Sequence, residues 1–149
     1  MRQIIYAMQF IGNAAAMAGS PSVLKATTTA SSCSITSTVG PEGVRGELRT
    51  TKGDKAIFES EVTLTGETSF RESGTIRFGD TPHRLHFSTV GGGSIGASAD
   101  PRLKHGSVSW QLDSGEGQFA GASGLITSDF TISDTGEVID NHFGLIFLP

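Results

Sequence analysis

The sequence has very little cysteine and few charged residues. Cys33 is the only cysteine among 149 residues, so the chain can form no internal disulfide bond and no zinc site built from several cysteines. Charged residues make up 17%, against about 25% in ordinary proteins. Fifteen acidic and eleven basic residues give a net charge of −4. This balance argues against nucleic acid or an anionic membrane surface as a partner, because both attract a basic face.

Long apolar runs and familiar catalytic motifs are also missing. No run reaches the ~18 apolar residues of a membrane-spanning helix, so we expect no membrane span. There is no nucleotide-binding, zinc-protease or nucleophile-elbow motif. We therefore expect no cofactor.

The N-terminal segment allows two interpretations. Arg2, an apolar stretch and small residues up to Ala18 are similar to a secretory signal peptide. The stretch is interrupted by three amides, at Gln3, Gln9 and Asn13. These favour a first β-strand, so we expect a cytoplasmic protein. Secretion is the alternative, if residues 1–18 are a signal peptide.

Glycine is abundant, at 20 of 149 residues, about twice the usual ~7%. Short apolar stretches alternate with clusters of Gly, Pro, Asp and Ser, which is typical of an all-β sandwich or barrel. We expect a single domain over 1–149. Strands are predicted at about 2–12, 22–29, 33–39, 43–50, 55–65, 68–78, 83–90, 106–113, 123–133 and 137–148. Turns are predicted at 40–43, 52–54, 79–82 and 134–136. Residues 91–105 are expected to form a loop, a short helical turn or a cover over one end of a barrel.

Alternation within several strands indicates which side chains face inward, because successive residues of a strand point to opposite faces. Three strands carry a clear apolar face, namely Phe70, Glu72, Gly74, Ile76 and Phe78 in 68–78, Leu85 and Phe87 in 83–90, and Val108, Trp110 and Leu112 in 106–113. The last strand is apolar on both faces from Phe143 onward, which is typical of a strand buried on both sides. We therefore expect a neighbouring element or another subunit to cover its outer face, and on this ground we expect a homo-oligomer such as a dimer or trimer.

Two segments resemble the allene oxide cyclase family. The first is FRESGTIRFGD at 70–80, followed by His83 and a second strand that ends at Gly91. The second is GEGQFAGASG at 115–124, which is similar to a glycine run that enters a strand in that family, with related forms in dirigent proteins and spirotetronate cyclases. The resemblance covers about 68–148. It implies a closed antiparallel β-barrel of about eight strands, oligomeric, with a small hydrophobic molecule in its lumen and a cyclisation or isomerisation that needs no cofactor and no metal.

The match also has departures. Phe70 corresponds to a phenylalanine that lines the barrel near the ligand in the family. Gly74 and Ile76 stand where the family has aromatic residues, and Gly92 follows Gly91 where the family has a tyrosine. We therefore expect a larger cavity and a bulkier ligand, and we do not infer allene oxide cyclase activity itself.

Glu72 is the candidate catalytic residue. Inside a barrel, desolvation raises the pKa of a carboxyl group and suits it to general acid or base chemistry. The alternatives are an ion pair with an arginine or a position in water near the barrel mouth. The residues expected to bind substrate are Gln9, Phe70, Gly74, Ile76, Phe87 and Trp110. Gln9 belongs to this set if its face of the first strand points inward, rather than the face with Tyr6, Met8 and Phe10.

The other acidic and histidine side chains show weaker signs of a catalytic or metal-binding site. Glu59 and Glu61 share one strand face, which is typical of a solvated face. Asp140 and His142 also share a face, but nothing has the spacing of a metal site, so we expect no metal and histidines at the surface. The function expected is a cofactor-free isomerase or cyclase. The alternatives are a non-enzymatic carrier or sensor of a similar ligand, and a structural oligomer whose lumen is filled by side chains.

Overall fold

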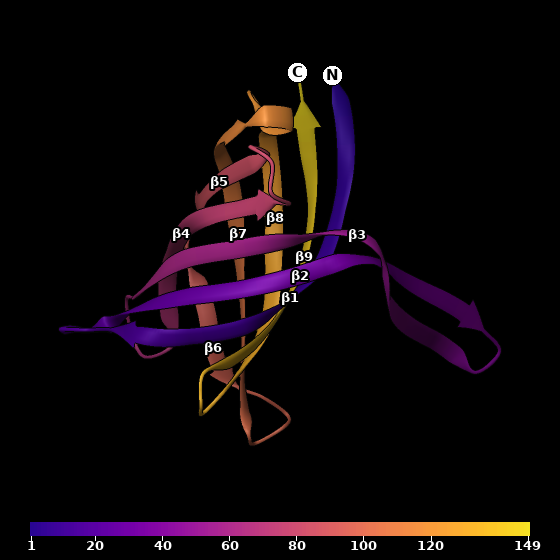
Figure 1. Cartoon of the computed structure of the whole chain (residues 1–149). Coiled ribbons are helices and arrows are strands. Elements are labelled where there is room, and N and C mark those ends of the chain that lie inside the picture. Colours follow the sequence, from indigo (N-terminus) through magenta and orange to yellow (C-terminus); the bar gives the residue numbers. More distant parts are fainter.

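The computed structural model describes residues 1–149, and nearly all of the chain lies in nine β-strands (Figure 1). A single turn of 3-10 helix, η1, spans Gly117–Phe119. The strands are β1 (Arg2–Met17), β2 (Ser20–Gly40), β3 (Gly43–Leu64), β4 (Ser69–Phe78), β5 (Arg84–Thr89), β6 (Gly93–Ala97), β7 (Leu103–Glu116), β8 (Ser123–Ser133) and β9 (Glu137–Leu148). No helix is long and apolar enough to cross a membrane.

The strands form one closed antiparallel ring. Neighbours follow the order β3-β2-β1-β9-β8-β7-β5-β4, and β3 also pairs with β4, which closes the sheet. The short strands β5 and β6 occupy the same place, because each lies between β4 and β7. The ring therefore has eight positions, and the prediction of a closed antiparallel barrel of about eight strands is confirmed.

Strands β2 and β3 are each longer than predicted. The sequence predicts breaks near residue 30 and at 52–54, but both strands are continuous. The predicted turn at 52–54 is therefore wrong. Opposite this segment, the register of β2 shifts between Ser31 and Cys33. Ser32 Oγ donates a hydrogen bond across to the carbonyl oxygen of Asp54 at 2.7 Å. Beyond this bulge the two strands leave the barrel together and end at the predicted 40–43 turn (Figure 1).

The segment 91–105 supplies the short strand β6. Gly91 has φ 71°, a conformation that favours glycine. At Gly93 the ring of Phe70 occupies the space that a Cβ atom would take. This close approach lets β6 pair with β4 beside a buried aromatic side chain.

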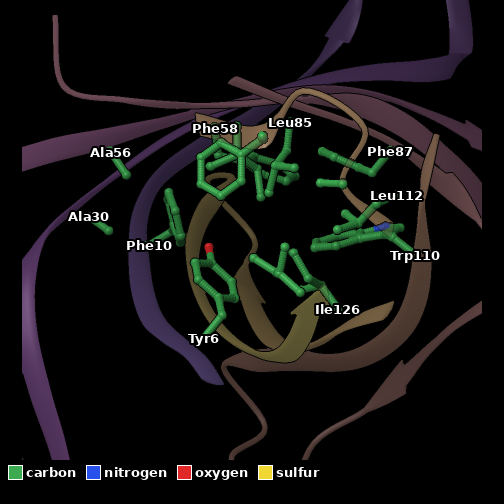
Figure 2. Packing of buried hydrophobic residues seen from close by; sticks show 14 of the residues in the cluster. Tyr6, Phe10, Ala30, Ala56, Phe58, Leu85, Phe87, Trp110, Leu112 and Ile126 are labelled. Atoms are coloured by element: carbon green, nitrogen blue, oxygen red, sulfur yellow. The ribbon is translucent and has the colours of Figure 1, made fainter. Parts of the chain in front are cut away.

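The predicted inward faces of β4, β5 and β7 are confirmed by burial. Figure 2 shows aromatic and aliphatic side chains converging inside the ring from strands far apart in the sequence. Phe58 lies at the centre, with ring centroids 5.3 Å from Phe87, 5.5 Å from Trp110 and 5.9 Å from Phe10. These rings fill the middle of the barrel.

The last strand alternates as predicted. His142 and Ile146 are buried in the barrel, whereas Phe143 and Leu145 are exposed on its outer face. The N-terminal segment is a strand, as expected, and pairs with β9 along most of its length. An apolar outer face therefore runs along β1 and β9.

Candidate functional site

A cavity of about 100 Å³ occupies one end of the barrel lumen. Its outer part is aliphatic and partly exposed, with Leu24, Leu64 and Ile132 at the rim. Its inner part is buried and carries the polar side chains, namely Thr28, Glu72, Ser128 and Asp140, beside Phe58. An engineered apolar cavity of about 150 Å³ binds benzene, so this cavity, at about 100 Å³, takes a group somewhat smaller than one ring in its present shape, and a larger ligand extends past the rim or displaces side chains.

Glu72 points into the barrel because alternation along β4 places it on the buried face, and β3 and β7 supply its partners. Ser60 Oγ donates to its Oε1 at 2.6 Å, and Trp110 Nε1 donates to its Oε2 at 3.2 Å. The main chain of Glu72 is also fixed, because its N–H and its carbonyl oxygen both bond the Thr89 hydroxyl, at 2.7 and 2.8 Å. The carboxyl group is thus held by neutral donors and not by an arginine.

Burial sets the protonation of this carboxyl group. Desolvation raises the pKa of Glu72 from an ordinary value of 4.5 to about 7, the hydrogen bonds from Ser60 and Trp110 oppose that rise, and the nearby carboxylate of Asp140 adds to it. Near neutral pH both the acid and the carboxylate are therefore populated. A group in this state can give or accept a proton, as general acid–base chemistry requires.

A second buried polar group joins β1, β8 and β9. Asp140 accepts from Ser128 Oγ at 2.6 Å and bonds His142 Nε2 at 2.9 Å. Tyr6 Oη lies 3.2 Å from His142 Nδ1. Burial, with the charge of Asp140, raises the pKa of Tyr6 well above its usual value, so the phenol keeps its proton. Both oxygens of Asp140 are therefore engaged, one by Ser128, which also lines the cavity, and the other by His142, which does not.

The structure brings together only part of the predicted site. Phe70 and Glu72 line the cavity, but Ile76, Phe87 and Trp110 lie among the packed rings instead. Gly74 does not enlarge the cavity, because a Cβ atom there would meet the main chain of Glu59 and Ser60 on β3. The expectation of a larger cavity was therefore wrong at this position, where glycine serves close strand packing.

Gln9 was assigned to the site on the condition that its face of the first strand points inward, and that condition is not met. Tyr6 and Phe10 are the buried residues of β1, and Gln9 lies on the opposite face, where its Nε2 donates to Asn141 Oδ1 at 2.9 Å. Because β1 alternates, an inward Phe10 requires an outward Gln9. The amide therefore bridges β1 and β9 on the outside of the barrel.

Sequence reasoning missed several polar residues of the interior, among them Ser60, which donates to Glu72. Thr28 is buried, and its Oγ1 has no hydrogen-bond partner. Ser128, Asp140 and His142 are also buried. The expectation that histidines lie at the surface fails for His142, whose place on one face with Asp140 was the available signal. The glutamates expected on a solvated face, Glu59 and Glu61, are exposed. No group of three or more His, Cys, Asp or Glu side chains is arranged to hold a metal ion.

Comparisons with known proteins bear on the fold. Neither the scan against protein-family models nor the search of curated proteins found a match. Among solved structures, the chain is similar to a pterocarpan synthase dirigent protein, with a TM-score of 0.50 and 14% identity over 98% of this chain and 86% of that chain. At this identity the likeness is one of fold. It supports the barrel expected from the resemblance to allene oxide cyclases and dirigent proteins.

Proposed function

We propose that the lumen cavity binds a small hydrophobic molecule and that the protein isomerises or cyclises it without a cofactor. The observation that carries this proposal is the Glu72 carboxyl group, which lies in an otherwise mostly apolar cavity with a pKa of about 7. A buried carboxyl group held in both protonation states at neutral pH is a common feature of acid–base sites.

Glu72 serves both proton transfers of such a reaction. In its acid form it gives a proton to an oxygen or carbon of the bound molecule. The carboxylate that remains takes a proton from another atom of the same molecule. Substrate and product then have the same composition, and the enzyme returns to its starting state. The cavity wall contributes by holding the molecule folded and by excluding water, which strengthens each remaining polar contact.

The polar groups of the cavity favour an uncharged ligand with a hydroxyl group. Glu72 and Asp140 are acidic and would repel a carboxylate or phosphate. Thr28 lines the cavity and its enclosed Oγ1 has no partner in the protein, so once the side chain turns toward the cavity, a ligand hydroxyl bonds it at the cost of no existing hydrogen bond. The aliphatic rim contacts the apolar part of the same molecule.

A non-enzymatic carrier or sensor is the second candidate. Both oxygens of Glu72 and both oxygens of Asp140 already have partners in the protein. That satisfied arrangement favours binding without turnover. A purely structural barrel is a further alternative, supported by the aromatic rings that fill the middle of the lumen. The proposal also includes a cytoplasmic homo-oligomer, in keeping with the exposed Phe143 and Leu145 of β9.

The ligand class is tested with three probes of similar shape, followed by the fluorescence of Trp110. We expect 4-ethylphenol to bind more tightly than ethylbenzene, which has no hydroxyl, and more tightly than 4-ethylbenzoate, which is anionic at neutral pH. Equal affinity for the phenol and the benzoate would contradict the assigned ligand class. Absence of binding by all three, together with no molecule released on denaturation of the purified protein, would favour the filled barrel.

Turnover is tested on the molecule that copurifies with the protein, identified by native mass spectrometry and denaturing extraction. We expect the wild-type protein to convert added molecule to an isomer of equal mass that separates by chromatography. Glu72→Gln should lose this conversion and keep its fold, whereas Glu61→Gln, on the outer face of β3, should keep both. Tight binding with no conversion by any of the three proteins identifies a carrier or sensor.

A further inference from the structure

The part of the β2–β3 hairpin that leaves the barrel, residues 33–50, has one apolar face; we call this segment the arm (Figure 1). Ile35 pairs with Leu48 and Val39 pairs with Val44, so all four side chains lie on the same side. Val39 and Val44 are 83% and 72% exposed. The opposite face carries polar and charged side chains, including Arg45, Glu47 and Arg49.

An isolated two-stranded ribbon is marginally stable in water. The arm contacts nothing else along most of its length, and every residue from 34 to 50 is exposed. Its polar face suits solvent, but its row of aliphatic side chains does not. The arm therefore has the form of a ribbon that is completed by packing against another apolar surface.

A matching surface lies on the outside of the same barrel. We call it the outer strip, and it consists of Ile5 and Ile11 of β1, Ile139, Phe143 and Leu145 of β9, and Leu125 of β8. In the sheet Leu145 lies between Ile5 and Leu125, and Ile11 pairs with Ile139. Between the strip residues of β1 and β9, the other outward side chains are Ala7, Gln9 and Asn141, and none of these carries a charge.

The arm and the outer strip meet at one edge. A hollow of about 200 Å³ is lined by Gln9 and Ile11 of β1 on one side and by Cys33 and Leu48 of the arm on the other. The strip and the apolar face of the arm thus form the two walls of one concave surface. The arm projects away from the barrel (Figure 1), so most of its apolar face remains apart from its own strip.

We propose that the apolar face of the arm docks on the outer strip of a second copy of this chain. Each chain carries both halves of the contact, so a symmetric pair or a closed ring covers every arm and every strip. The sequence predicts only that the outer face of the last strand is covered. The present proposal adds that the arm is the element that joins the copies.

The dimensions are sufficient for a specific interface. At ~3.3 Å per residue and ~4.8 Å between strands, the arm presents a face about 25 Å long and about 10 Å wide. Two reciprocal contacts of that size bury on the order of 1,000 Å², which is near the lower bound for specific association. The strip is at least as wide, since it spans three strands. On β1 and β9 the strip has no charged side chain to desolvate, and the exposed Asp129 of β8, which pairs with Asn141, lies at its border.

Analytical ultracentrifugation of the full chain tests the proposal. We expect the wild-type protein to sediment as an oligomer. The arm variant Val39→Asp/Val44→Asp and the strip variant Phe143→Asp should each weaken association by roughly 100-fold or more, because an unpaired carboxylate would be buried. Thr38→Asp, on the polar face of the arm, and Thr63→Asp, on the outer face of β3, are matched controls that should associate like wild type.

Mixing the two variants identifies which surfaces meet. The arm variant has an intact strip, and the strip variant has an intact arm, so a mixed pair keeps one of the two contacts, and the mixture should associate more strongly than either variant alone but less strongly than wild type. An arm variant that still associates would show that strips pair with strips and would overturn the proposal. A wild-type chain that is monomeric at high micromolar concentration would overturn it as well. All the substituted positions are exposed, and circular dichroism confirms that each variant is folded.

Discussion

The indole N–H of Trp110 donates a hydrogen bond to Oε2 of Glu72, 3.2 Å away inside the barrel. Trp110 is the only tryptophan of the chain. The ionisable group at the candidate site is therefore in direct contact with the one indole fluorophore. This contact provides a way to measure the protonation of Glu72 without knowing the ligand.

The first prediction concerns the fluorescence of Trp110. Because burial raises the pKa of Glu72 to about 7, we expect the emission of the native protein to change in a single step centred near pH 7. Glu72→Gln should abolish the step, and Glu116→Gln, at an exposed carboxyl group on β7, should leave it in place. A midpoint close to pH 4.5 would show that the carboxyl group is not desolvated, and a step that persists in Glu72→Gln would assign the change in emission to another group near Trp110.

The second prediction concerns stability and pH. The pKa of Glu72 is raised on folding, so the native state holds this proton more tightly than the unfolded state does. The contribution of the group is complete below pH 4.5 and is lost as pH rises through about 7. Over this window the free energy of unfolding of wild type should fall, relative to Glu72→Gln, by about 3 kcal/mol.

Urea unfolding of both proteins at several pH values measures this difference. All other ionisable groups are present in both proteins, so the difference reports Glu72 together with its coupling to Asp140. A difference that stays constant across the window, or that rises with pH, would contradict the assigned burial of Glu72.

Much of the barrel was predictable because several strands repeat apolar residues with a period of two. This holds for β4, β5 and β7, where Phe70, Leu85 and Trp110 are each buried as expected. The break placed in β3 was wrong because Gly53 and Asp54 have turn-like composition, and the break placed in β2 coincides with the register shift between Ser31 and Cys33. Composition cannot reveal that two strands remain paired across a bulge, since the pairing partner supplies the missing stability.

The candidate site was predictable at Glu72 and Phe70 but not at Thr28 or Asp140. A threonine or aspartate inside a barrel breaks the apolar pattern on which an inward assignment depends. Trp110 and Phe87 were correctly placed inside the barrel, yet the division of the lumen into a packed part and a cavity depends on the diameter and stagger of the ring. Those quantities arise from long-range pairing and leave no local signal in the sequence.

The third prediction concerns Thr28. Its buried Oγ1 has no partner, and a buried unsatisfied hydroxyl costs about 1–3 kcal/mol. Thr28→Val keeps the shape and removes the hydroxyl, so we expect the unliganded protein to gain about 1 kcal/mol of stability. The same change should weaken binding of 4-ethylphenol roughly fivefold to tenfold, since one ligand hydrogen bond is lost.

The control is Thr27→Val, on the exposed outer face of β2. It should change neither the affinity for 4-ethylphenol nor, by more than a few tenths of a kcal/mol, the stability. If Thr28→Val destabilises the protein by as much as a cavity-forming substitution, the hydroxyl has a partner in solution. If it leaves the affinity unchanged, the ligand does not reach Thr28.

The fourth prediction separates close strand packing from ligand binding at Gly74. A Cβ atom at Gly74 would meet the main chain of Glu59 and Ser60, which cannot move without displacing β3. Gly74→Ala should therefore cost about 1–3 kcal/mol, the usual range for overpacking. Gly96→Ala is the matched control, because a Cβ atom at Gly96 in β6 has no heavy atom within 4 Å. Thermal unfolding of the two variants measures the contrast, and equal melting temperatures would show that Gly74 has room for a side chain and return it to the set of candidate ligand contacts.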